Sequence, residues 1–435
     1  MKNSAFPGKS RKLFLLCFFA YSAIYIGRKN FSACMPGMIA AGAIDKVLGG
    51  TTGTAFLAVY ACGQLVNGLL GDRLNPKNMI TVGLLGAAAA NAAMGLNSAR
   101  TMFPVIWGIN GYFCSMIWAP VIRLMSERMT DEERQSSGAA ISAAIPAGSV
   151  LSYLVCAFVL GVADWRAAFL ACSAILAASA AFFFVRMTAL LGKDGVGGKI
   201  EEGRAKAANE LEAAPLPERL ERLKKAPLPL LVVLTGLCFA VGAILFNGIL
   251  KDGLDLWVPS YISEYFGLDD AVAAGMSTVL PVVNIIGIYI ARFINVRYIK
   301  NEFGTCALLF GVSALSFVPL VTISAVGARG AGFAVLAVLL VSLTSASMLG
   351  INSMLLTFIP FKFARIGRAS SVTGFLNSCS YVAASLSGVT IGVISSSYGW
   401  TAAVLAFLAV SLLGGAISAA GIKVWRRNAE LLSEE

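Results

Sequence analysis

Long apolar runs recur along the whole chain and restrict its fold more than any other feature. Runs of roughly 17 to 25 residues are enough to cross about 30 Å of hydrocarbon, because a helix rises about 1.5 Å per residue. Only 13% of the residues are charged, about half the proportion found in soluble domains. The sequence therefore predicts an all-α membrane protein.

We count twelve transmembrane segments, six on each side of a polar stretch. Their expected ranges are 13–39, 52–70, 79–96, 102–125, 138–160, 167–187, 228–261, 272–293, 303–323, 330–359, 369–395 and 401–424. The polar stretch carries eight Lys or Arg and seven Asp or Glu residues, which is typical of a solvated linker. We therefore divide the chain into an N-terminal six-helix bundle (1–191), a cytoplasmic linker (192–226) and a C-terminal six-helix bundle (227–435).

Two short motifs recur at nearly the same separation in the two halves. Arg134-Gln-Ser-Ser-Gly corresponds to Arg368-Ala-Ser-Ser-Val, 234 positions later. Trp165-Arg-Ala-Ala corresponds to Trp400-Thr-Ala-Ala, 235 positions later. This repetition favours two pseudo-symmetric six-helix bundles around a site near the membrane midplane.

The positive charges lie mainly on one side of the predicted helices. If the N-terminus is inside, 25 of the 34 Lys and Arg residues fall in cytoplasmic segments and four fall in outer loops. This distribution follows the positive-inside rule and places both termini in the cytoplasm. It accounts for the net charge of +11 without a nucleic-acid partner. We expect a multi-pass protein of the cytoplasmic membrane, in contact with membrane lipid, and nothing demands more than a monomer.

The residue types exclude several kinds of chemistry. The chain has no histidine, which excludes histidine-based catalytic relays, proton relays and metal triads. Its nine cysteines lie singly in apolar segments without C-x-x-C spacing and are interpreted as small hydrophobic residues. No glycine-rich phosphate loop and no nucleophile elbow occur. We therefore expect that the protein is not an enzyme and has no cofactor and no metal site.

Two adjacent cations, Arg28 and Lys29, interrupt the first apolar segment. A helix that ended at Gly27 would span only about 22 Å from Leu13 and would place both cations outside. The alternative is one long, tilted helix with Arg28 near the midplane. A cation there costs roughly 2.5 to 3.5 kcal/mol, so a chain keeps one mainly where it faces a water-filled cavity and meets an anion. We adopt this interpretation.

A third cation, Lys251, occupies the corresponding helix of the second half, followed by Asp252 and Asp255. Lys251 and Asp255 are one helical turn apart and could pair with each other. Otherwise Lys251 faces Arg28 across the symmetry axis and the two form a divided cationic site. Two facing cations with few buried carboxylates indicate an anionic substrate, because the planar fork of arginine binds phosphate or carboxylate through two hydrogen bonds.

Motifs in both halves of the chain form one recognisable set. The first is Tyr25-Ile-Gly-Arg28-Lys29-Asn30-Phe31 with Met35-Pro36, and the second is Gly71-Asp72-Arg73-Leu74-Asn75-Pro76. The others are Gly111-Tyr112, Trp118, Pro120, Arg123, Glu133-Arg134, Asp164-Trp165, Trp257-x-Pro259-x-Tyr261 and Gly399-Trp400. In these motifs the chain resembles the organophosphate:phosphate antiporter family of the major facilitator superfamily, which includes glycerol-3-phosphate and hexose-6-phosphate antiporters.

The resemblance implies the major facilitator fold, with twelve transmembrane helices in two pseudo-symmetric bundles. It assigns Arg28 and Lys251 to binding of the phosphoryl group, with Lys29 as an accompanying cation that contributes to the electric field. The best-known relatives have arginine at the position of Lys251 and lysine at that of Gln64. The site of this chain is thus less basic than theirs.

Further polar residues are candidates to line the cavity, although hydrogen bonding between helices explains each of them equally well. Tyr25 is the best placed, because it lies three residues before Arg28 on the same helix face. The other predicted substrate contacts are Gln64, Asn67, Trp118 and Tyr381, and Tyr60, Asn284 and Asn377 have the same character.

Five charged residues are candidates for gating or coupling. Asp72, Arg73 and Arg134 are expected to lock the cytoplasmic ends of helices in one conformation. Asp252 and Asp255 are expected to form a gate salt bridge or to neutralise Lys251.

The expected function is exchange of inorganic phosphate for an organic phosphate ester by alternating access. One alternative is symport of another organic anion with protons or sodium, in which Asp252 or Asp255 would be the coupling carboxylate. Another is a sensor that binds sugar phosphate without transporting it, although the linker and the short tail offer no large soluble region for signalling.

Overall fold

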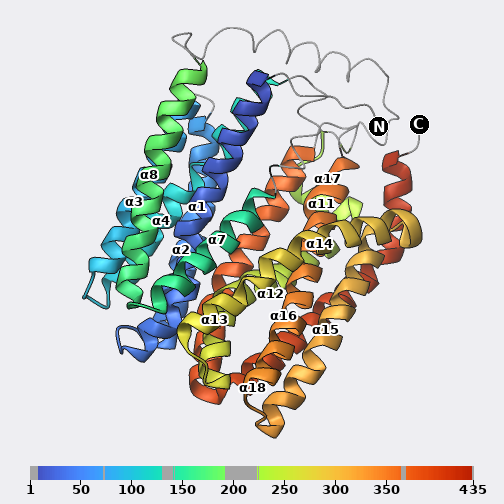
Figure 1. Ribbon diagram of the computed structural model, residues 1–435. Helices are drawn as coiled ribbons and strands as arrows, with labels where there is room; N and C mark the ends of the chain where they lie inside the picture. Colours follow the sequence, from blue (N-terminus) through green and yellow to red (C-terminus); the bar gives the residue numbers. More distant parts are fainter. Residues whose placement is uncertain are drawn as a thin grey trace. The chain divides into compact units, whose positions relative to one another are not determined.

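All the long secondary-structure elements of the computed structural model are helices. The structure describes residues 8–71, 74–129, 141, 143–191, 223, 225–363 and 369–433. Figure 1 shows the helices in chain order. The helices of the first half are α1 (Gly8–Ala40), α2 (Lys46–Gly71), α3 (Pro76–Leu96), α4 (Met102–Ser115), α5 (Trp118–Arg128), α7 (Ala144–Leu160) and α8 (Trp165–Leu191). Those of the second half are α11 (Leu228–Thr235), α12 (Leu237–Phe266), α13 (Asp270–Ser277), α14 (Val279–Ile294), α15 (Glu302–Val326), α16 (Ala331–Ser353), α17 (Ile359–Phe361) and α18 (Ala369–Ser433), with π-helical turns η1 (Asn295–Ile299) and η2 (Met354–Phe358).

The described part of the chain confirms the all-α membrane class. It contains nine helices that are long and apolar enough to cross a membrane. One of them, α18, changes direction at Gly399, whose φ of 79° and ψ of 176° are not helical, so it covers two of the expected segments. The apolar helices α2 and α7 cover two more, which makes the helices consistent with the twelve predicted segments.

Glycine also breaks the expected segment 228–261. Gly236 has a φ of 74° and ends α11, and α12 begins at the next residue. Such left-handed backbone is easy for glycine because it has no Cβ. The sequence predicted one continuous helix here because its apolar pattern continues across the break.

Equivalent helices of the two halves begin with the same kind of N-terminal cap, an asparagine side chain. The side chain of Asn75 accepts hydrogen bonds from the backbone N–H groups of Lys77 and Asn78 at the start of α3. Asn301 accepts one from Gly304 at the start of α15. Asparagine at this position satisfies N–H groups that have no partner within the helix. The shared cap adds to the internal repetition seen in the sequence.

The chain divides into two compact units, and each is described by itself. Unit 1 comprises Met1–Glu201 and Val258–Val282, and unit 2 comprises Glu202–Trp257 and Val283–Glu435. The long helix α12 therefore contributes its first part to unit 2 and its last part to unit 1. The division into bundles of 1–191 and 227–435 stays a prediction.

Close approaches at glycine hold the helices of unit 1 together. A Cβ at Gly148 of α7 would overlap the carbonyl oxygen of Ser22 in α1, and one at Gly111 of α4 would lie 2.5 Å from the carbonyl oxygen of Phe56 in α2. α1 also packs against α8, and α3 packs against α8 and α4. α1 is thus enclosed in unit 1, and this packing fixes the helix that carries Arg28.

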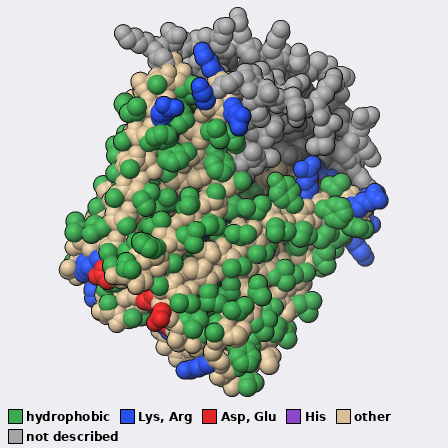
Figure 2. Space-filling model, in the orientation of Figure 1, with side chains coloured by type: hydrophobic (Ala, Val, Ile, Leu, Met, Phe, Trp, Pro, Cys, Tyr) green, Lys and Arg blue, Asp and Glu red, His purple; other side chains and the backbone are tan. Residues whose placement is uncertain are grey.

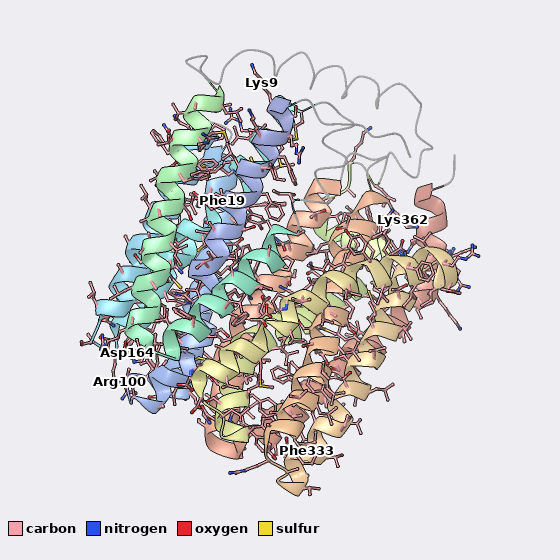
Figure 3. All side chains as sticks on the ribbon, in the orientation of Figure 1. Lys9, Phe19, Arg100, Asp164, Phe333 and Lys362 are labelled. Carbon is pink, nitrogen blue, oxygen red and sulfur yellow. The ribbon has the colours of Figure 1, made fainter. Side chains whose placement is uncertain are left out.

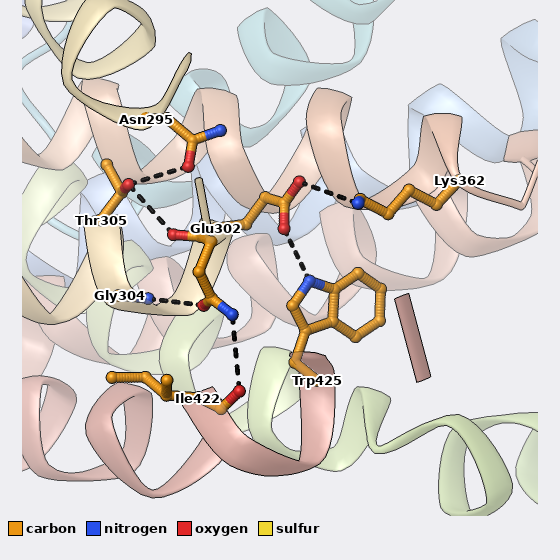
Figure 4. Close-up of polar contacts among 8 residues, drawn as sticks. Asn295, Glu302, Gly304, Thr305, Lys362, Ile422 and Trp425 are labelled. Carbon is orange, nitrogen blue, oxygen red and sulfur yellow. Dashed lines mark hydrogen bonds and ion pairs between the residues drawn. The ribbon is translucent and has the colours of Figure 1, made fainter. Parts of the chain in front are cut away.

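Unit 2 has a similar construction around α15, which packs against α16 and α18. Phe310 of α15 lies against Gly414 of α18, where a Cβ would be 2.5 Å from its ring. At the end of the unit, Glu302 accepts a hydrogen bond from the indole N–H of Trp425 and lies 3.6 Å from the Nζ of Lys362 (Figure 4).

The outer surface of the helices is apolar, as a lipid environment requires. Figure 2 shows hydrophobic side chains over most of the visible helix surface, with few charged ones among them. Charged residues gather at helix ends: in unit 1, Lys9 lies at one end and Arg100 and Asp164 lie at the other (Figure 3).

Candidate functional site

Arg28 lies inside a continuous membrane helix. α1 runs from Gly8 to Ala40 and includes Pro36 without a break. The structure therefore contradicts the interpretation in which the first helix ends at Gly27, and it agrees with the one in which the helix continues. Arg28 and Lys29 are both half-buried, so the chain keeps two cations well inside the span, where each is costly.

Three aromatic rings surround the guanidinium group of Arg28. Its Cζ lies 4.5 Å from the ring centroid of Tyr60, 5.2 Å from that of Tyr25 and 5.4 Å from that of Phe56. Cation–π contacts of this kind contribute about 0.5 to 2 kcal/mol each, depending on exposure. They stabilise the positive charge inside the membrane helix without adding a negative charge of their own.

Side chains from three other helices fix the backbone of α1 directly before Arg28. The carbonyl oxygen of Gly27 accepts hydrogen bonds from Asn110 Nδ2 at 2.8 Å and from Asn91 Nδ2 at 3.1 Å. The carbonyl oxygen of Ile26 accepts one from Ser152 Oγ at 2.9 Å. These donors come from α4, α3 and α7, so the helices of unit 1 together define the position of Arg28.

Asn91 is also bonded through its oxygen, which accepts a hydrogen bond from Asn30 Nδ2 at 2.6 Å. Asn91, Asn110 and Ser152 were not among the residues predicted from the sequence. All three are buried polar residues in apolar segments, a pattern that marks bonds between helices. This signal could have identified them, but it does not tell which helix each one contacts.

The other predicted residues of unit 1 lie near the same part of α1. Gln64 Nε2 donates a hydrogen bond to the hydroxyl of Tyr60, which is one of the rings beside Arg28. The ring of Trp118 lies 4.9 Å from that of Tyr21, which in turn lies edge-on to Tyr25. Gln64, Trp118 and Tyr25 therefore reach the surroundings of Arg28 directly or through one neighbour.

Asn67 has a structural partner. Its Nδ2 donates a hydrogen bond to Ser115 Oγ at 2.7 Å, and its side chain is fully buried. This contact joins α2 to α4 and agrees with the bonding between helices that the sequence analysis gave as the equal alternative.

In unit 2, Lys251 forms an ion pair with the adjacent Asp252. The Nζ of Lys251 lies 2.9 Å from Asp252 Oδ2, and the side chains are 17% and 9% exposed. Asp252 and Asp255 were both expected as residues that could neutralise Lys251, and Asp255 lies half-buried one turn further along α12. The carboxylate of Asp252 offsets the charge of Lys251.

α18 passes close to α12 one turn before Lys251. A Cβ at Gly248 would overlap the carbonyl oxygen of Ser380, the residue before Tyr381. Further along, the indole N–H of Trp257 donates to the carbonyl oxygen of Gly388 at 3.2 Å. Tyr381 is half-buried on the part of α18 that lies close to the Lys251 region, and its contact with substrate stays a prediction.

Three predicted gating residues, Asp72, Arg73 and Arg134, lie outside the described residues. Next to the first two, the carbonyl oxygen of Leu74 accepts a hydrogen bond from Arg123 Nη1 at 3.1 Å. Arg28 belongs to unit 1 and Lys251 to unit 2, so the divided cationic site stays a prediction. In the described part of the chain, no group of three or more Cys, Asp or Glu residues could hold a metal ion.

Comparisons with known proteins support both the fold and the resemblance read from the motifs. A probable hexose phosphate transport protein of Chlamydia muridarum is 23% identical over 408 residues, which cover 92% of this chain and 88% of the relative. The membrane sensor protein UhpC of Salmonella typhimurium is 22% identical, and the match covers 94% of this chain and 90% of the sensor. These relatives confirm the resemblance to carriers of the organophosphate antiporter type.

A solved structure extends the likeness to three dimensions. A bacterial homologue of the human lysosomal transporter Spinster, in an inward-facing and unoccupied conformation, matches with a TM-score of 0.70 and 14% identity. The match covers 98% of this chain and 97% of that one. It confirms the predicted fold class. The family model of the Major Facilitator Superfamily matches residues 17–388, and the chain therefore belongs to this superfamily of membrane transporters.

Proposed function

We propose that the protein exchanges inorganic phosphate for an organic phosphate ester of the sugar phosphate or glycerol phosphate type by alternating access. The observation that carries this proposal is Arg28, a half-buried cation in α1 that is stabilised by three aromatic rings. A phosphorylated substrate is supported by the alignment with a probable hexose phosphate transport protein, which covers 88% of that relative.

The chemistry of Arg28 suits this substrate. A guanidinium group offers N–H donors in a planar fork that matches two oxygens of a phosphoryl group. The hydrogen bonds to Gly27 and Ile26 hold the backbone from which the fork extends, so little ordering is needed when the anion binds. We assign Arg28 and Lys251 to the phosphoryl group, Lys29 to the local field, and Tyr25, Gln64, Trp118 and Tyr381 to the cavity wall.

The proposal includes a place and an orientation in the cell. We infer that the protein lies in the cytoplasmic membrane with both termini inside, because most Lys and Arg residues then fall on the cytoplasmic side. Two six-helix bundles, 1–191 and 227–435, would move about the site between them.

Phosphate exchange in proteoliposomes tests the function. Purified protein is reconstituted with internal unlabelled phosphate, and uptake of labelled phosphate is measured with sugar, glycerol and glycerate phosphates as competitors. We expect uptake that requires internal phosphate, and we expect Arg28→Lys to lose most of it, because the charge remains but the fork is lost. Near-normal exchange by that variant would contradict the assignment of Arg28.

Arg100→Lys is the matched control. Arg100 forms an exposed ion pair with Asp45, with side chains 53% and 60% exposed, and such pairs contribute about 0 to 1 kcal/mol. This control should transport like the wild type, which separates loss of the fork at one site from a general effect of replacing arginine.

Symport of another organic anion with protons is the second candidate, and the ion pair of Lys251 with Asp252 favours it as an alternative. A buried carboxylate beside the site could carry the coupling proton. In that case an uncoupler would abolish uptake in wild-type vesicles and would have no further effect on Asp252→Asn. Exchange that is insensitive to the uncoupler would exclude this candidate.

The similarity to a membrane sensor protein favours one further test. A sensor should bind hexose phosphate in detergent but show no sustained flux after reconstitution. Binding together with flux supports the carrier, and binding alone supports the sensor.

A further inference from the structure

One end of unit 2 carries a concentration of exposed cations that the transport site does not use. We call this set the cationic face, and its members come from two segments more than 120 positions apart in the sequence. They are Arg292, Arg297, Lys300, Lys423, Arg426 and Arg427, and all six are exposed. Among the carboxylates whose side chains the structure describes, none forms an ion pair with any of them.

Two hydrogen bonds bring the segments together. Asn301 Nδ2 donates to the carbonyl oxygen of Ile422 at 3.4 Å, and the indole N–H of Trp425 donates to Glu302 Oε2 at 2.7 Å (Figure 4). Lys300 directly precedes Asn301, and Lys423 directly follows Ile422. Cations from the turn before α15 and from the end of α18 therefore lie on one face.

Glu302, an acidic residue beside this face, is turned away from it. Glu302 is 6% exposed, and its two oxygens lie against Trp425 and Lys362. Its carboxylate therefore does not neutralise the exposed cations beside it.

Lys300 ends the π-helical turn η1 with a left-handed backbone. Lys300 has a φ of 52°, a left-handed conformation that glycine and asparagine adopt more readily than lysine. Its N–H still closes the π-helical turn on Asn295 at 2.7 Å.

Exposed apolar side chains continue the face along α14. Tyr289, Phe293 and Val296 are 63%, 59% and 60% exposed, and Tyr298 is 69% exposed. Tyr289 and Phe293 lie one turn apart on α14, and Arg297 follows in the π-helical turn η1. Tyrosine beside Lys or Arg at the end of a membrane helix is typical of the level of the lipid headgroups.

We propose that the cationic face is a binding site for an anionic phospholipid such as phosphatidylglycerol. The headgroup phosphate contacts Arg297, Lys300 and Lys423, and an acyl chain lies along Phe293 and Tyr289. A cluster of cations at the end of membrane helices attracts anionic headgroups, and the adjoining apolar face distinguishes a lipid from free phosphate. The proposal does not depend on what the carrier transports.

Native mass spectrometry of the full-length protein tests the site. The protein is exchanged into detergent with equal amounts of phosphatidylglycerol and phosphatidylcholine, and the retained lipids are counted. The test variant is Arg297→Gln/Lys300→Gln/Lys423→Gln, and the matched control is Lys9→Gln/Arg11→Gln/Lys12→Gln, which removes three exposed cations from the start of α1. We expect the test variant to retain at least about fivefold less phosphatidylglycerol and the control less than about twofold less.

Three results would overturn the proposal. Equal losses in both variants would mean that the lipid responds to total charge, and no loss in the test variant would mean that the face binds no lipid. Displacement of the lipid by excess inorganic phosphate would point instead to a soluble anion. Unchanged thermal unfolding of each variant is the check on folding.

Trp425→Phe is a second variant that alters no charge. It removes the N–H donor to Glu302 but keeps an aromatic ring beside Phe303. If the bond between the segments positions the cations, this variant should retain about two- to threefold less phosphatidylglycerol with all six cations present. Full retention would show that the convergence of the two segments is not required.

Discussion

At the scale of single residues, the rings around Arg28 explain how α1 keeps a cation inside the membrane. Tyr60 is the nearest of them, with its ring centroid 4.5 Å from Cζ, and its hydroxyl accepts a hydrogen bond from Gln64. The ring and the hydroxyl therefore have separable roles: the ring stabilises the charge, and the hydroxyl holds Gln64.

Replacing Tyr60 separates the two roles. Tyr60→Phe should change the half-saturation for phosphate less than about twofold, because the ring remains. Tyr60→Leu should raise it by more than about twofold, because the guanidinium group loses a ring that holds it in place. Both values come from initial rates of phosphate exchange, and equal effects of the two variants would argue against a role for the ring.

The ion pair of Lys251 with Asp252 allows a prediction in the opposite direction. Asp252→Asn keeps the shape of the side chain and removes the charge that offsets Lys251, so phosphate should bind more tightly and its half-saturation should fall by about threefold or more. Asp269→Asn removes one negative charge at an exposed position and should have no effect. A weaker affinity in Asp252→Asn would assign Asp252 a different role.

At the scale of helices, the glycine contacts define how closely α1 can be enclosed. Gly148 of α7 meets the backbone of α1 at Ser22, three residues before Tyr25, and leaves no room for a methyl group. α1 therefore depends on a small residue of another helix for the position of its functional side chains, as is common in membrane helix packing.

Gly148→Ala should consequently destabilise the protein and impair exchange. An added methyl group in a filled contact costs about 1 to 3 kcal/mol, so we expect a lower thermal unfolding midpoint and a reduced rate. Gly332→Ala is the matched control, because no atom lies within 4 Å of the corresponding Cβ in α16. Comparable destabilisation in both variants would contradict the contact with α1.

The helices themselves were predictable from the sequence, since hydrocarbon thickness fixes the length of an apolar segment. The break at Gly236 and the turn at Gly399 were not placed, because the apolar pattern continues through both. Arg28 was identifiable by its charge alone. The residues that bond the backbone of α1 at Gly27 and Ile26 are Asn91, Asn110 and Ser152, which lie 64 to 126 positions further along the chain. Periodicity does not specify which helices meet.

At the scale of the whole molecule, transport requires two orientations of comparable stability. An ion pair that forms in only one of them biases the equilibrium between the two. In unit 1, Lys46 at the start of α2 lies 2.6 Å from Glu264 near the end of α12, with side chains 18% and 25% exposed. Because it is more shielded from water than Asp45 with Arg100, this pair is the stronger of the two.

The Lys46–Glu264 pair should therefore affect the balance of orientations. If Glu264→Gln removes about 1 kcal/mol from one orientation, the ratio of the two populations changes about fivefold. The half-saturation for phosphate offered from one side of the membrane should then fall relative to that from the other, since apparent affinity follows the population of the competent state. Oriented vesicles with phosphate on either side give both values. Asp45→Asn disrupts the exposed pair with Arg100 and serves as the control. An equal shift in both variants would indicate a general effect of surface charge. A shift in Glu264→Gln alone would identify the Lys46–Glu264 pair as one that stabilises a single orientation.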